Sequence, residues 1–118
     1  MEIYYDEVDS EVLVVKADGG LNARTADGFV TDLEKLVDAG LRKIIVNCSS
    51  LNYISSYGLG ILVRLHRRLA RHGGNVKIAS VKGVIVEVLR LTKLNTIFEI
   101  YPDVPRARLA FRPKTPSR

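Results

Sequence analysis

The chain has 118 residues, of which 47% are hydrophobic and 26% are charged. This length and this balance are typical of one soluble domain with its own core, and they exclude a largely disordered chain. No apolar run approaches the roughly 20 residues of a membrane span, and the acidic N-terminal segment does not read as a signal peptide. The one cysteine, Cys48, cannot form an internal disulfide, so we expect a reducing, cytoplasmic location without membrane association.

The net charge of +5 hides a division along the chain. Residues 1–38 contain ten acidic and three basic side chains, whereas residues 39–86 contain eight basic side chains and no acidic one. Five more basic residues follow from Arg106 onward. This polarity favours docking onto an acidic protein surface, self-association as a homodimer, or nucleic-acid binding, and charge alone does not choose among them.

The chain opens with two predicted strands, at 3–8 and 12–16, joined by a tight turn at Asp9-Ser10. The second strand is almost continuously apolar, which is expected of a strand covered on both faces. The cluster Asp18-Gly19-Gly20 is predicted to end it.

A helix follows, with Asn22 or Thr25 as its cap and Gly40 as its stop. Its apolar residues recur with helical spacing and form one stripe: Ala26, Phe29, Val30, Leu33 and Val37.

The centre of the chain is predicted to hold a buried strand at 43–47, then a loop at 48–54 with two apolar anchors, then a helix at 56–72. One side of this helix is apolar and carries Leu59, Leu62, Leu65 and Leu69. The opposite side is basic and carries Arg64, Arg67, Arg68 and Arg71. Gly73-Gly74 is expected to end the helix.

The remaining elements are a strand at 75–79, a helix at 83–93, a strand at 97–101 and a short helix at about 106–111. The helix at 83–93 is expected to face inward through Ile85, Val88, Leu89 and Thr92. Because strands and helices alternate, we predict the α/β class. We place the domain at 1–105 and a basic, proline-containing tail at 106–118.

Residues that carry catalysis or metal binding are few. His66 and His72 lie six residues apart on one predicted helix, so they do not share a face, and Cys48 directly follows a buried strand. We expect His66 to be a partly buried helix residue, His72 to lie at the helix end, and Cys48 to be a small core residue.

Cofactor motifs are also missing. Gly58-Leu59-Gly60 lies between a strand and a helix, but Val63 stands where a dinucleotide fingerprint needs glycine, and no GxxxxGK[ST] segment is present. We therefore predict no metal, no cofactor and no enzymatic activity.

The turn Ser55-Ser56-Tyr57-Gly58-Leu59-Gly60 is the strongest candidate for a working site. Ser56 is predicted to cap the helix, which stabilises it by about 1 kcal/mol. Gly58 and Gly60 each cost roughly 1 kcal/mol of helix propensity if they lie in the helix interior. Two explanations stay open: a partner surface approaches closely at these glycines, or Gly60 packs against a strand of the same domain. A phosphate on a hydroxyl here would lie at the positive end of the helix dipole.

The segment IIVNCSSLNYISSYGLGILVRLHRRLARHGG, together with the later LRLTKLNTIFEIY, resembles the STAS domain of bacterial anti-sigma factor antagonists and sulfate transporters. The resemblance covers about residues 2–105 and implies a single domain with a small mixed β-sheet flanked by helices. It also implies partner switching, in which an antagonist binds an anti-sigma factor that is also a serine kinase and thereby frees the sigma factor. That kinase then phosphorylates the antagonist at this turn and is released.

The chain departs from the family pattern Asp-Ser-Ser-Gly, in which the second serine is modified. The matching residues are Ser55, Ser56, Tyr57 and Gly58, so a tyrosine stands at the acceptor position. Because the tyrosine hydroxyl projects further from the backbone than a serine hydroxyl, this departure leaves two alternatives: a constitutive antagonist without control by serine phosphorylation, or a member of the family that serves another system. The expected partner-binding surface is Ser55, Ser56, Tyr57, Gly58, Leu59, Gly60 and Leu62.

Two other functions stay open. The arginine stripe and the basic tail could bind nucleic acid, although no interleaved aromatic residues support base stacking. The helix start could instead be an anion site that senses a nucleotide or another small ligand. We favour protein binding over both.

Overall fold

The structure, a computed structural model, describes residues 2–111 apart from the side chains of residues 21 and 23–26. Its strands are β1 (Glu2–Tyr5), β2 (Val12–Leu21), β3 (Lys43–Ile54), β4 (Asn75–Ala79) and β5 (Glu99–Tyr101). Its helices are α1 (Ala23–Asp38), α2 (Ser56–Ala70), α3 (Val84–Leu91) and α4 (Val104–Phe111), with a short 3₁₀ turn, η1 (Leu94–Thr96), before β5.

The five strands form one sheet in the order β1-β2-β3-β4-β5. β1 pairs with β2 in antiparallel orientation, and every other neighbouring pair is parallel. The predicted α/β domain with a small mixed sheet flanked by helices is therefore confirmed.

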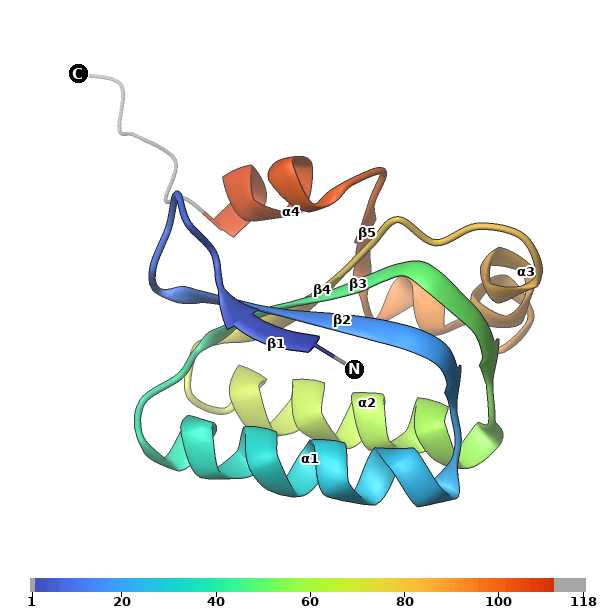
Figure 1. The fold of residues 1–118 in the computed structure, drawn as a ribbon, viewed down its shortest axis with the longest axis horizontal. Helices are drawn as coiled ribbons and strands as arrows, with labels where there is room; N and C mark the ends of the chain where they lie inside the picture. The colour runs from blue at the N-terminus through green and yellow to red at the C-terminus, as the bar shows by residue number, and fades with distance from the viewer. Residues whose placement is uncertain (1, 112–118) are drawn as a thin grey trace.

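The helices cover the two faces of the sheet unequally. α1 and α2 lie side by side along one face, α4 lies across the other, and α3 lies beside the end at which α1 and α2 begin (Figure 1). The larger core is enclosed between the sheet and the α1–α2 pair, and the smaller one is enclosed under α4. The predicted apolar stripes lie in the larger core, where Phe29, Val30, Leu33 and Val37 of α1 and Leu59, Leu62, Leu65 and Leu69 of α2 are buried.

The central strand is longer than predicted. The expected strand at 43–47 and loop at 48–54 form one continuous strand, β3, which pairs with β2 to its end. β2 likewise runs through Asp18-Gly19-Gly20 instead of ending there, with Gly19 in the left-handed region at φ +67°. Irregular register between Lys16 and Asp18 and between Gly19 and Gly20 bends the pair without ending it. The predicted loop was wrong because residues 48–54 stay paired with β2, and β3 accommodates one extra residue at each irregularity as a bulge.

Other boundaries differ by a few residues. The first strand ends at Tyr5 because the Asp6 carboxylate accepts hydrogen bonds from the N–H groups of Val8 and Asp9 and closes the turn early. The helix predicted at 83–93 is shorter, and Thr92, which we expected to face inward, is exposed.

Gly73 and Gly74 follow α2 as predicted. Gly73 adopts φ +81°, and a Cβ on Gly74 would collide with the Arg42 carbonyl oxygen. The second glycine is therefore required by a close backbone approach.

Helix α4 closes the second face of the sheet. Ala107 is fully buried, and the Arg108 guanidinium donates to the Asp6 carboxylate at 3.0 Å from the opposite end of the chain. The predicted domain boundary at residue 105 falls inside this helix and stays a prediction, while residues 112–118 of the predicted tail lie outside the described residues.

The Asp6–Arg108 pair predicts a pH-dependent contribution to stability. Burial raises the pKa of Asp6, but hydrogen bonds from the N–H groups of Asp9 and Val8 and from Arg108 outweigh it and hold the pKa below its usual 3.8. The stabilisation is therefore present above about pH 4 and is lost as the pH falls through the lowered pKa. We expect Arg108→Met to lower the unfolding free energy by about 2 kcal/mol at pH 7, because it leaves a buried carboxylate without its charged partner.

The measurement is denaturant unfolding between pH 7 and pH 3, with Arg106→Met as the matched control, because Arg106 is exposed. The control should change stability by no more than about 0.5 kcal/mol. The difference in unfolding free energy between wild type and Arg108→Met should disappear toward pH 3. An equal difference at all pH values would contradict this assignment.

Candidate functional site

The predicted turn lies where β3 passes into α2, and Ser55 caps the helix. Its backbone is extended (φ −83°, ψ 165°), and its Oγ accepts a hydrogen bond from the Gly58 N–H at 3.0 Å. Ser56, which we predicted to be the cap, is the first helical residue and is exposed. The prediction was wrong by one residue because either of two adjacent serines can satisfy the same orphan N–H.

The seven predicted site residues divide into two groups. Gly58, Leu59 and Leu62 are buried and belong to the core side of α2. The surface that a partner could touch comes from the half-buried Ser55 and from the exposed residues Ser56, Tyr57 and Gly60.

Gly60 lies open on this surface. A Cβ built on it would meet no atom within 4 Å, so the explanation that Gly60 packs against a strand is wrong. It belongs to a shallow groove of about 470 Å³ lined by Ser56, Leu59, Gly60, Val63, Arg67, Thr92 and Leu94. Thr92 and Leu94 come from the end of α3 and from η1. No sequence pattern pointed to them, because only the folded chain brings this segment beside α2.

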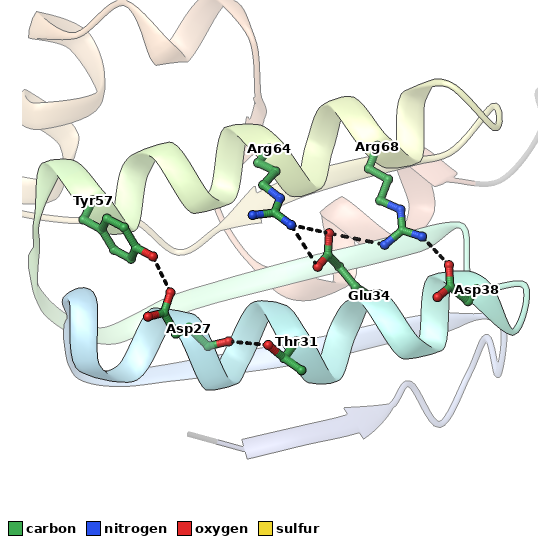
Figure 2. A network of polar contacts seen from close by, with 7 residues as sticks. All are labelled: Asp27, Thr31, Glu34, Asp38, Tyr57, Arg64 and Arg68. Atoms are coloured by element: carbon green, nitrogen blue, oxygen red, sulfur yellow. Dashed lines mark hydrogen bonds and ion pairs between the residues drawn. The ribbon is translucent and has the colours of Figure 1, made fainter.

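Tyr57, which the resemblance places at the acceptor position, contacts α1. Its hydroxyl donates a hydrogen bond to the Asp27 carboxylate (Figure 2). This hydrogen bond, with the nearby negative charge, raises the pKa of Tyr57 and keeps the phenol protonated. No sequence pattern pointed to Asp27, which lies thirty residues away.

Two of the four arginines of the predicted stripe also contact α1. Arg64 Nη2 lies 3.3 Å from both carboxylate oxygens of Glu34, and Arg68 Nη1 lies 3.2 Å from Glu34 Oε2. Arg68 makes a second ion pair with Asp38 (Figure 2). The acidic N-terminal part and the basic middle part of the chain therefore neutralise each other partly within the fold. The predicted arginine stripe is not wholly a solvated face.

The other candidate residues, His66 and Cys48, lie in environments typical of residues with a structural role. His66 is half-buried, its Nδ1 accepts from the Val76 N–H at 3.3 Å, and its ring meets Phe98 edge-on at 5.2 Å. Burial lowers the pKa of His66, so its ring is neutral at pH 7. Burial also raises the pKa of the Cys48 thiol to about 12, which leaves the thiol protonated and unreactive.

Within residues 2–111, no three His, Cys, Asp or Glu side chains gather closely enough to hold a metal ion. No helix in this part of the chain is long and apolar enough to cross a membrane.

Comparison with known proteins identifies the family. The family model described as "STAS domain" matches residues 6–107. The proposed anti-sigma factor antagonist BtrV of Bordetella bronchiseptica is 26% identical over 116 residues, covering 98% of this chain and 99% of that protein. A proposed anti-sigma factor antagonist of Thermotoga maritima is 28% identical over 93% of this chain and 97% of its own length.

Solved structures show the same fold. The crystal structure of a proposed anti-sigma factor antagonist from Thermotoga maritima superimposes with a TM-score of 0.86 at 24% identity, covering 95% of this chain and 94% of the other. The unphosphorylated form of the anti-sigma factor antagonist SpoIIAA gives a TM-score of 0.71 at 16% identity, covering 94% of this chain and all of that one. The match over residues 6–107 and the shared fold lead to one conclusion. This chain belongs to the STAS domain family, and the proteins that it resembles include proposed anti-sigma factor antagonists.

Proposed function

We propose that this chain is a non-enzymatic antagonist that binds an anti-sigma factor of the serine-kinase type and so frees a sigma factor. Its similarity over nearly full length to proposed anti-sigma factor antagonists supports this role. The observation that carries the proposal is the surface at the start of α2, where Ser56 and the open Gly60 line a groove with apolar side chains from Leu59, Val63 and Leu94. A site of this kind suits a docked protein, because a glycine without neighbours lets a second backbone come close.

We further propose that serine phosphorylation does not control the antagonist. The acceptor position holds Tyr57, and a phosphate on its hydroxyl would face the Asp27 carboxylate, which now accepts that hydroxyl's hydrogen bond. Ser55 Oγ already accepts the capping hydrogen bond from the Gly58 N–H. Ser56 is exposed, but one residue along a helix turns a side chain by about 100°, so its hydroxyl points away from the acceptor direction.

Nucleic-acid binding is the weaker alternative. Arg64 and Arg68 are engaged by acidic residues of α1, which removes half of the predicted stripe. The homodimer and the nucleotide site stay predictions, as does the cytoplasmic location.

Gly60 provides the first test of the binding surface. Gly60→Trp should weaken binding to the anti-sigma factor by on the order of a hundredfold, because the indole would fill the groove that the partner enters. Gly60→Ala is the matched control, and it should keep the fold and raise its stability by up to about 1 kcal/mol, since alanine is the better helix former and meets no atom. The affinities are measured by calorimetry with an anti-sigma factor recovered from the native cell by affinity purification. Equal affinity of wild type and Gly60→Trp would contradict the proposed surface.

Tyr57 provides the test of regulation. When the anti-sigma factor kinase and ATP are added, the wild-type chain should stay unmodified, whereas Tyr57→Ser should gain one phosphate at residue 57. The substitution restores a short hydroxyl at the acceptor position and removes the hydrogen bond to Asp27. Intact-mass and fragment mass spectrometry read the outcome. A wild-type chain phosphorylated on Ser55, Ser56 or Tyr57 would show that the switch is intact.

A further inference from the structure

Helix α2 carries a row of three residues that binds α1. Tyr57, Arg64 and Arg68 are spaced by seven and then four residues, and they bind Asp27, Glu34 and Asp38, which have the same spacing on α1 (Figure 2). Each pair is separated by thirty residues, so the two helices run side by side in constant register. We call this row the filled seam. It shows that α2 accepts an acidic helix along its length.

The same spacing recurs three residues further along, at Gly60 and Arg67 of α2 and at Arg71, which caps the C-terminal end of the helix with helical backbone angles. A step of three residues rotates the position by about 60° around a helix, so this second row lies beside the first. All three residues are exposed, and among residues 2–111 neither arginine has an ion-pair partner. We call this row the open seam.

The open seam changes from apolar to basic along its length. Its first part is the groove around Gly60, whose apolar side chains include Val63 and Leu94. Its second part is a shallow basic hollow lined by Arg64, Arg67, Ala70 and Arg71. Arg67 borders both, so the two parts join into one strip that is apolar at the start of α2 and cationic at its end.

We propose that the open seam binds an acidic amphipathic helix of the partner, laid along α2 as α1 is laid along its other side. This inference rests on the proposed function and extends the contact from the turn at Ser55 to Arg71. The partner helix presents two carboxylates four residues apart to Arg67 and Arg71, and a small or apolar side chain seven residues from the first of them to Gly60. Gly60 matches the position of Tyr57 in the filled seam, and its lack of a side chain gives the incoming helix room.

A helix fits this strip better than a nucleic acid does. A phosphate backbone needs a longer track of cations, and the groove around Gly60 has an apolar floor with no aromatic side chain for base stacking. The carboxylates of α1 already demonstrate the geometry on the neighbouring row. The charge and the spacing of the strip therefore both point to an acidic helix.

A peptide titration tests the seam without a natural partner. The probe is an alanine-rich helical peptide with two glutamates four residues apart and a leucine seven residues before the first, added to ¹⁵N-labelled full-length chain. We expect amide shifts confined to the outer face of α2 from Gly60 to Arg71. A peptide of the same composition with the glutamates on opposite faces should bind roughly tenfold more weakly. Equal binding of the two peptides, or equal shifts with an oligonucleotide of the same charge, would overturn the proposal.

The anti-sigma factor itself provides the second test. Arg67→Glu and Arg71→Glu should each weaken its binding by on the order of tenfold at low salt. The matched control is Lys35→Glu, the same charge reversal on the exposed part of α1. If wild type binds an anti-sigma factor and all three variants bind it as well as wild type does, the open seam is not the binding site and the proposed function stands. If wild type binds no anti-sigma factor, the proposed function fails, and the peptide titration alone decides the seam.

Discussion

The rotation of α2 about its own axis determines which of its side chains face the sheet, α1 and the solvent. Leu65 and Leu69 are fully buried against the sheet, and burial of such a side chain is worth roughly 1.5–3 kcal/mol, so the leucine face can point only inward. With that face fixed, Tyr57, Arg64 and Arg68 must point toward α1. The remaining face, which carries Gly60 and Arg67, must then point to solvent.

The polar contacts between α1 and α2 set the register of the two helices, but they contribute little to the free energy of folding. Arg64 is mostly exposed, and an exposed ion pair contributes only about 0–1 kcal/mol. Glu34 is more enclosed and accepts from two arginines, so it fixes the register between the helices. One basic row of α2 therefore holds α1, and we propose that the neighbouring row binds a partner.

Much of this was predictable from the sequence, and the exceptions have physical causes. The leucine spacing of α2 and the glycines after it gave the helix and its buried face, because local periodicity reports burial directly. The extended β3 could not be foreseen, since residues 48–54 are held in a strand, through two bulges of β3, by pairing with β2 far away in sequence. Asp27, Thr92 and Leu94 were also missed, because their roles come from contacts between distant segments. The cap is Ser55 and not the predicted Ser56, because two adjacent serines carry the same hydroxyl group and the sequence does not tell them apart.

Release of a sigma factor in the presence of ATP would distinguish a constitutive antagonist from a phosphorylated one. The chain is added to a preformed complex of sigma factor and anti-sigma factor kinase, and free sigma factor is followed over time by fluorescence anisotropy. A constitutive antagonist should free sigma factor in proportion to the amount of chain added and hold it free while ATP remains. Recapture of sigma factor as ATP is consumed, with phosphate appearing on the chain, would show instead an ordinary phosphorylation switch. No release at all would remove the chain from this pathway.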